Sequence, residues 1–145
     1  MNKQKAILIV EDEPDDLELI VRALGDDNPI LHLITCHNGM EALEYLNSLR
    51  ERPNGRSYPT LVLLDLSMPK VGGMDFLRDI RSQTQFRLLP VVIFSSSKNK
   101  DDILKCYEAG ANGYVNKPSD YDGFKDALRA ISKYWITINK LVQEY

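Results

Sequence analysis

Ala-Ile-Leu-Ile-Val at positions 6–10, followed by Glu-Asp-Glu-Pro at 11–14, decides the fold class of this chain. Five apolar residues in a row, three of them β-branched, are typical of a strand that is buried on both faces. Pro14 suits the first turn of a helix, and Asp15 and Asp16 favour the positive end of the helix dipole. The stretch therefore predicts a buried strand that leads through an acidic loop into a helix.

The same alternation of apolar runs and helical stripes continues along the chain. Gly25 is expected to end the first helix. Further strands are predicted at 30–36, 60–64, 90–94 and 113–115, with helices between them and a last helix over about 120–143. Such strands need helices on both sides of one sheet. The predicted fold class is α/β, a doubly wound five-stranded parallel sheet, in a single domain over residues 1–145 with no separate output domain.

Length and charge narrow the classes of function. The 145 residues carry 18 basic and 21 acidic side chains, so the net charge of −3 disfavours direct binding to nucleic acid or to an anionic membrane surface. No apolar run approaches the ~20 residues of a membrane span. Cys36 and Cys106 are expected to be free thiols in a reducing compartment. The sequence thus predicts a cytoplasmic domain that binds neither nucleic acid nor membrane.

Polar side chains stand at the ends of four predicted strands. They are Glu11 and Asp12 after the first strand, Asp65 after the third, Ser95 after the fourth and Lys117 after the fifth. Binding sites in open parallel sheets lie at the carboxyl ends of the strands, so these groups are expected to converge. Clustered carboxylates need a cation among them, and their hard oxygens suit Mg²⁺. Because a carboxylate can also attack phosphorus, the set favours a phosphoryl-transfer site.

Each of these residues, and each of the neighbouring acids, also has a purely structural interpretation. Acids after a strand often cap the next helix. Taken singly, that interpretation is favoured for Glu11, Glu13, Asp15 and Asp16. Asp65 is about as well explained as a cap, a serine run usually only begins a loop, and a lysine before Pro118 is usually solvated. Only the joint occurrence at one edge of the sheet favours the functional interpretation.

The ordered motifs resemble the receiver domains of two-component response regulators. They are Ile-Leu-Ile-Val-Glu-Asp-Glu at 7–13, Leu-Leu-Asp-Leu-Ser-Met-Pro at 63–69, Pro-Val-Val-Ile-Phe-Ser-Ser at 90–96 and Gly-Tyr-Val-Asn-Lys-Pro at 113–118. The resemblance covers about residues 5–133. It implies the flavodoxin-like or CheY-like strand order 2-1-3-4-5. It also implies the cis bond that receivers usually have between Lys117 and Pro118.

The resemblance implies a phosphoacceptor and a metal site. Asp65 would accept the phosphoryl group. Asp12, Asp65 and the backbone carbonyl of Ser67 would bind Mg²⁺ directly, and Glu11 would act through water.

The resemblance further implies contacts to the phosphoryl group and a switch. Lys117, the Ser95 hydroxyl and the Ser96 amide would bind the phosphoryl group. Ser95 and Tyr114 would form the switch, with the tyrosine turning inward when the serine moves toward the phosphate. A tyrosine that is merely packed on its strand is the alternative.

The partners are likewise implied by the resemblance. A sensor histidine kinase would donate the phosphoryl group, so the chain would be no enzyme beyond its own phosphorylation and dephosphorylation. A downstream protein target or phosphotransfer protein would bind the face of helix four, strand five and helix five. The loop 50–59 and the Tyr134-Trp135 pair resemble the stand-alone regulators of bacterial phytochrome kinases.

A heptad-like stripe runs along the predicted last helix. Its members are Phe124, Leu128, Ile131, Trp135, Ile138 and Val142. The first half can pack on the sheet. The outer half either packs against a second copy, giving a homodimer through the same face, or folds back on its own domain. The β-branched residues at 136–138 disfavour a regular helix there.

Three other functions compete with this interpretation. A receiver-fold adaptor that works without phosphorylation would not need the acidic set. An Asp-nucleophile phosphatase of the haloacid-dehalogenase type would need a second aspartate two residues after the nucleophile, where Ser67 stands. A flavodoxin-like FMN protein would need a Gly-rich phosphate loop after the first strand, where the acids stand. His32 and His37 lack partner ligands and are expected to be ordinary residues, not a phosphodonor or metal site.

Overall fold

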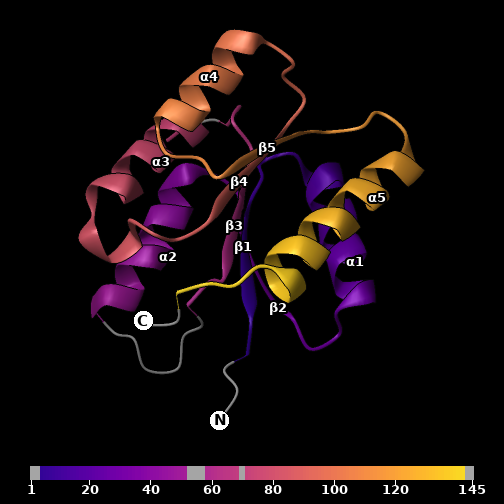
Figure 1. Ribbon diagram of the computed structural model, residues 1–145, viewed down its shortest axis with the longest axis horizontal. Helices are drawn as coiled ribbons and strands as arrows, with labels where there is room; N and C mark the ends of the chain where they lie inside the picture. Colours follow the sequence, from indigo (N-terminus) through magenta and orange to yellow (C-terminus); the bar gives the residue numbers. More distant parts are fainter. Residues whose placement is uncertain (1–3, 52–57, 69–70, 143–145) are drawn as a thin grey trace.

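The computed structural model describes residues 4–51, 58–68 and 71–142. Its strands are β1 (Ala6–Val10), β2 (His32–Cys36), β3 (Leu61–Leu64), β4 (Val91–Ser95) and β5 (Gly113–Asn116). Its helices are α1 (Pro14–Asp27), α2 (Gly39–Glu51), α3 (Gly73–Ser82), α4 (Lys100–Glu108) and α5 (Tyr121–Ser132), with a 3-10 turn η1 (Thr84–Phe86) and a π-helix η2 (Lys133–Ile138). Helices α2, α3 and α4 lie on one side of the sheet, and α1 and α5 lie on the other (Figure 1).

The five strands form one parallel sheet in the order β2-β1-β3-β4-β5. This confirms the predicted fold class and the strand order that the resemblance implies. Strand β1 is the second strand in the sheet. The edge strand β2 lies on one side of it, and the interior strand β3 lies on the other. Because all strands run the same way, their carboxyl ends meet at one edge, where the polar residues of the sequence are expected to converge.

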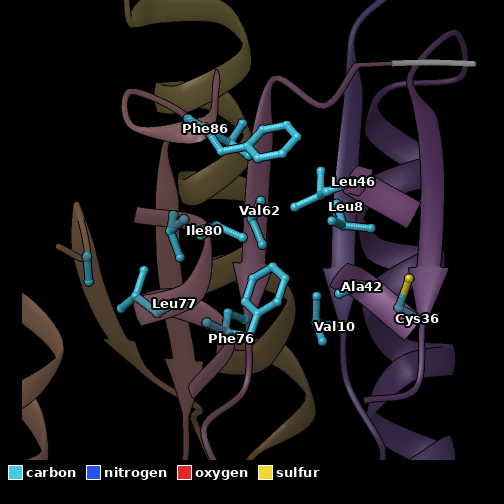
Figure 2. Packing of buried hydrophobic residues seen from close by; sticks show 14 of the residues in the cluster. Leu8, Val10, Cys36, Ala42, Leu46, Val62, Phe76, Leu77, Ile80 and Phe86 are labelled. Carbon is cyan, nitrogen blue, oxygen red and sulfur yellow. The ribbon is translucent and has the colours of Figure 1, made fainter. Parts of the chain in front are cut away.

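Two apolar clusters, one on each face of the sheet, hold the layers together. Successive residues of β1 alternate between them, with Leu8 in one cluster and Ile9 in the other. Figure 2 shows the first cluster, where Phe76 and Leu77 of α3 and Leu46 of α2 lie against the sheet. Burial on both faces explains why the strands read as continuous apolar runs rather than as alternating ones.

Helix α1 is longer than predicted, because it passes through Gly25 and ends at Asp27. Contacts with α5 hold its last turn. Arg129 Nε lies 2.9 Å from a carboxylate oxygen of Asp27, and Asn28 Nδ2 donates to Ser132 Oγ at 2.9 Å. These contacts stabilise the last turn against the ~1 kcal/mol that a glycine costs within a helix. The prediction that Gly25 ends the helix is therefore wrong.

The remaining boundaries differ from the predicted ones by one or two residues where both ends are described. The predicted loop 50–59 begins within α2, and positions 52–57 lie outside the described residues. No cis peptide bond occurs in the part of the chain that the structure describes, so the implied cis bond between Lys117 and Pro118 is wrong. None of the helices among the described residues is long and apolar enough to cross a membrane.

The end of the chain departs most from the prediction of one helix over about 120–143. Helix α5 ends at Ser132, η2 continues to Ile138, and residues 139–142 are not helical. The Asn139 N–H donates to the carbonyl of Tyr134, five residues back, at 2.6 Å. This is the wider hydrogen-bonded turn of a π-helix. The predicted extension of a regular helix to 143 is therefore wrong.

The wider turn changes which side chains face the interior. Ile136, which is not part of the predicted stripe, is only 6% exposed and packs in the cluster beneath α1 and α5. The stripe members Ile138 and Val142 are 53% and 54% exposed. Lys5 Nζ donates to the carbonyl of Ile136, where the carbonyl end of a helix favours a cation. The inner part of the tail thus folds onto its own domain, whereas part of its outer surface stays open.

Candidate functional site

The carboxyl ends of β1, β3, β4 and β5 border a polar cavity of about 310 Å³. Its lining residues are Glu11, Asp12, Glu13, Asp16, Asp65, Ser67, Ser95, Ser96, Ser97 and Lys117. The structure thus brings together every residue that the sequence analysis singled out for the site except Tyr114. They come from four strand ends that are far apart in the sequence, because parallel topology places those ends side by side.

Three acids converge within this cavity. Glu11, Asp12 and Asp65 each offer a carboxylate oxygen, and the three oxygens lie within 4.8 Å of one another. Burial raises the pKa of Glu11 to about 7; the hydrogen bond from Lys117 opposes this rise and the charge of Asp65 adds to it. Burial also raises the pKa of Asp65, against the attraction of Lys117. Acids this close stay ionised together only beside a cation, and oxygen donors in this number suit Mg²⁺.

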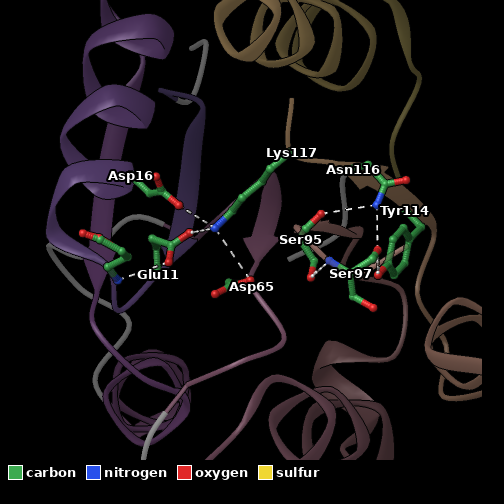
Figure 3. Close-up of polar contacts among 9 residues, drawn as sticks. Glu11, Asp16, Asp65, Ser95, Ser97, Tyr114, Asn116 and Lys117 are labelled. Atoms are coloured by element: carbon green, nitrogen blue, oxygen red, sulfur yellow. Dashed lines mark hydrogen bonds and ion pairs between the residues drawn. The ribbon is translucent and has the colours of Figure 1, made fainter. Parts of the chain in front are cut away.

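Lys117 reaches across the sheet edge to acids from three other segments (Figure 3). Its Nζ lies 2.6 Å from Glu11 Oε1, 2.9 Å from Asp16 Oδ2 and 3.8 Å from Asp65 Oδ1. Burial lowers the pKa of Lys117, but the hydrogen bonds to Glu11 and Asp16 and the charge of Asp65 outweigh burial and raise it. The lysine therefore stays charged in a site where its side chain is only 7% exposed.

A hydrogen-bonded network centred on Ser97 joins β4, α4 and β5. The Ser97 N–H donates to the buried Ser95 Oγ at 3.2 Å. The Ser97 carbonyl accepts from the Tyr114 hydroxyl at 2.7 Å and from Asn116 Nδ2 at 2.6 Å. The Ser97 hydroxyl donates to Asp102 Oδ2 at 2.6 Å. Tyr114 is half-buried. Its hydroxyl is hydrogen-bonded to the segment after β4 (Figure 3).

Close backbone packing fixes the position of Asp65. Its N–H donates to the Val10 carbonyl at 3.0 Å. A Cβ on Gly73 would lie 2.4 Å from the Asp65 carbonyl oxygen and 2.9 Å from Cα of Leu66. Only glycine lets the start of α3 approach this closely, since any larger side chain meets backbone atoms that cannot move aside cheaply. Strand β3 and helix α3 together therefore set where the carboxylate stands.

Asp16 lines the cavity although sequence reasoning, which favours a helix-capping role for it, does not place it in the site. The true cap of α1 is Glu13, whose Oε1 accepts from the Asp15 N–H at 3.0 Å. The available signal was the position of Asp16 in the first turn after a strand that ends in site residues. The Ser97 network also went unnoticed, because a short serine run carries no sign of its partners.

The two histidines take no part in the site. His37 Nδ1 lies 3.1 Å from Glu41 Oε1 in an exposed pair, and His32 is exposed on the edge strand β2. Neither histidine lines the cavity. Their placement agrees with the expectation that both are ordinary residues.

Converging acids and a buried lysine at the carboxyl edge of a doubly wound sheet are the features that the resemblance to receiver domains implies. The chain belongs to the response regulator receiver domain family, whose profile matches residues 7–129. This family acts in two-component signalling, where its members interact with histidine kinases and downstream targets and are generally not enzymes.

Several relatives match nearly the whole chain. The probable methanogenesis regulatory protein FilR2 of Methanothrix harundinacea is 38% identical over 137 residues, which cover 92% of this chain and 85% of FilR2. Response regulator Rcp1 of Synechocystis is 31% identical over 135 residues, 93% of this chain and 91% of Rcp1.

Two solved structures agree closely with the fold. The phosphorylated cyanobacterial phytochrome response regulator RcpA superposes with a TM-score of 0.88 at 34% identity, covering 96% of this chain and 99% of RcpA. The Mn²⁺-bound form of Rcp1 superposes with a TM-score of 0.86 at 30% identity, covering 95% and 99%. Phytochrome response regulators are therefore among the relatives of this chain.

Proposed function

We propose that this chain is a one-domain response regulator, spanning residues 1–145, that accepts a phosphoryl group on Asp65. One observation carries the proposal. The Asp65 carboxylate is buried at the carboxyl end of β3, within 4.8 Å of oxygens of Glu11 and Asp12 and 3.8 Å from Lys117 Nζ. A carboxylate in this position has both a metal-binding acid pair and an ammonium beside its nucleophilic oxygen, as phosphoryl transfer requires.

The acid cluster is the proposed Mg²⁺ site. Asp12 and Asp65 would bind the ion directly, with the backbone carbonyl of Ser67 as a further ligand and Glu11 acting through water. Three converging carboxylate oxygens fit a small hard cation. The Mn²⁺-bound structure of the relative Rcp1 supports a divalent ion in such a domain. When bound, Mg²⁺ would supply neutralising charge for the phosphoryl oxygens.

The proposed donor is the phosphohistidine of a sensor histidine kinase. An Asp65 oxygen attacks the phosphorus, and the new O–P bond replaces the P–N bond. The imidazole, protonated on its other nitrogen, leaves with the electron pair of that bond as a neutral ring. Water later attacks the phosphorus, breaks the O–P bond and releases inorganic phosphate, which restores the carboxylate. The chain thus promotes only its own phosphorylation and dephosphorylation.

Residues beside Asp65 are the proposed phosphoryl contacts and switch. Lys117, the Ser95 hydroxyl and the Ser96 amide would hold the phosphoryl oxygens. Ser97 donates its N–H to Ser95 Oγ and accepts the hydroxyl of Tyr114, so a shift of Ser95 acts on the segment that holds the tyrosine. The added charge would thereby favour one of two conformations that already exist.

The proposed output surface is the face of α4, β5 and α5. Leu104 and Tyr107 of α4 and Tyr121 of α5 are large hydrophobic side chains exposed on these two helices, which favours a protein partner. That partner would be a downstream target or a phosphotransfer protein. The name of RcpA, a phytochrome response regulator, suggests a phytochrome as the kinase on the input side. The proposed compartment is the cytoplasm, whose reducing conditions suit the free thiols of Cys36 and Cys106.

A second copy of the chain is a further proposed partner at this face. The exposed Ile138 of η2 supports the proposal, because it is a large apolar side chain open to solvent beyond the end of α5. Sedimentation at high concentration, with and without beryllofluoride as a phosphoryl mimic, tests it. A monomer under both conditions would contradict self-association.

Phosphorylation by a small-molecule donor tests the main proposal. Incubation with Mg²⁺ and phosphoramidate should add one phosphoryl group that is stable in acid, labile in base and maps to Asp65. The adduct should be absent in Asp65→Asn and present in Asp75→Asn, a control at an exposed position in the first turn of α3. Absence of the adduct from the natural chain would favour a phosphorylation-independent adaptor. Sustained hydrolysis of unrelated phosphate esters would instead indicate an Asp-nucleophile phosphatase.

A further inference from the structure

Asp16 contributes charge to the site without belonging to its acid cluster. It stands in the first turn of α1, and its Oδ2 lies 2.9 Å from Lys117 Nζ. It is not among the three acids whose oxygens converge within 4.8 Å. Its side chain is 30% exposed, whereas that of Glu11 is 2% exposed. Asp16 therefore acts on the site through the lysine rather than at the phosphoacceptor itself.

The distances from Lys117 Nζ show which acids its ammonium group contacts. The group has three N–H donors. Two short contacts go to Glu11 and Asp16, while Asp65 Oδ1, at 3.8 Å, lies beyond hydrogen-bond distance. In Figure 3 the lysine lies between Asp16 and Glu11 on one side and Asp65 on the other. The two short contacts hold the ammonium toward α1 and away from the proposed phosphoacceptor.

The charge balance of the cavity sets the sign of the effect. Among the described residues, five acids and one lysine line it. Phosphorylation would add further negative charge at this edge, since a phosphoryl group carries about −1.5 to −2 near neutral pH. Asp16 occupies the ammonium that would offset this charge and adds a negative charge of its own. Neutralising Asp16 removes neither the acceptor nor a member of the converging cluster, and unlike Glu13, Asp16 does not cap α1.

We propose that Asp16 is a charge brake on phosphorylation. Asp16 holds Lys117 toward α1 and places an extra negative charge beside the cavity. It therefore slows transfer of a phosphoryl group to Asp65, and it weakens the contact between Lys117 and the phosphoryl oxygens once the group is attached. The inference rests on the proposed function of Asp65. Asp16 is a positioning residue in this account, because it acts through the lysine.

Asp15 provides a matched control. It lies in the same helical turn and is exposed, and the contact described for it is made by its backbone N–H to the cap Glu13. Replacing Asp15 or Asp16 by Asn changes the net charge and the charge at the helix start equally. A difference between the two variants therefore reports on the contact with Lys117 and not on helix stability.

The test compares rates of phosphorylation by phosphoramidate at saturating Mg²⁺. Asp16→Asn should react about two- to fivefold faster than the natural chain, the factor expected from losing one partly exposed ion pair. It should also bind beryllofluoride more tightly by a similar factor. Asp15→Asn should match the natural chain, and Asp16→Glu, which keeps the charge, should restore the slow rate. Circular dichroism checks that all variants are folded.

Two results would overturn the brake. One is an Asp16→Asn rate equal to or below that of the natural chain, because the contact would then be neutral or would help the reaction. The other is equal acceleration in Asp15→Asn, because the effect would then be one of general charge. Failure of the natural chain to form any adduct is a separate result, and it removes the proposed function together with the brake.

Discussion

Replacement of Ile136 by alanine tests the π-helical end of the chain. The side chain is 6% exposed and packs in the cluster that α1 and α5 form with the sheet. The substitution removes three carbon groups from this cluster. At ~0.8 kcal/mol for each buried group, the transfer cost alone is about 2.4 kcal/mol. The cavity left behind adds to this cost, so the expected loss of unfolding free energy is about 2–4 kcal/mol.

Ile138→Ala is the matched control, because it makes the same chemical change two positions further on at a side chain that is 53% exposed. Its expected cost is within about 0.5 kcal/mol. Urea unfolding followed by circular dichroism measures both variants, and an unchanged dependence on urea would show that the denatured states are comparable. A loss at Ile138 equal to or greater than that at Ile136 would refute the π-helical register and restore the regular helix that the heptad stripe predicts.

Three further substitutions test other parts of the structure. Gly73→Ala should lower the melting temperature and the yield of phosphorylated Asp65, because the new Cβ meets the Asp65 carbonyl at 2.4 Å; an unchanged melting temperature contradicts the close packing. In metal-free protein, stability should fall as the pH rises from 4.5 to about 7, because the unfolded chain loses the Glu11 proton before the folded chain does. Glu11→Gln should flatten this slope in urea titrations, and an equal slope in both proteins would exclude Glu11 as its source. Arg81→Met should cost about 2–4 kcal/mol, since Arg81 donates to three oxygens, two of them main-chain carbonyls; a cost below about 0.5 kcal/mol would show that water replaces these bonds.

The strands and most of the site could be predicted because their signals are local. Leu61–Leu64 is a continuous apolar run, and burial on both faces is what such a run indicates in a parallel sheet. Asp65 and Lys117 could be placed at one edge because each follows a strand, and parallel strands end together. The order of the strands came from the family resemblance, since apolar runs alone do not fix which strands are neighbours.

The remaining features depend on contacts between distant segments. Asp16 and Lys117 are 101 positions apart, so no local sequence pattern near either residue predicts their ion pair. The π-helical turn buries Ile136, which lies outside the predicted stripe, and leaves the stripe member Ile138 exposed, while Trp135 packs against the cluster as predicted. In both cases tertiary packing decides between local arrangements that the sequence allows equally well.

The contact between Lys5 and the carbonyl of Ile136 has a consequence for synthesis of the chain. It joins positions 131 residues apart, and it holds Ile136 of η2 beside the cluster that Ile7 and Ile9 of β1 form with residues of α1 and α5. On the ribosome, this strand emerges well before the segment that completes its cover. The nascent chain therefore leaves part of this apolar cluster uncovered until η2 has emerged, and termination before residue 136 would leave that part open to chaperones, proteases and aggregation.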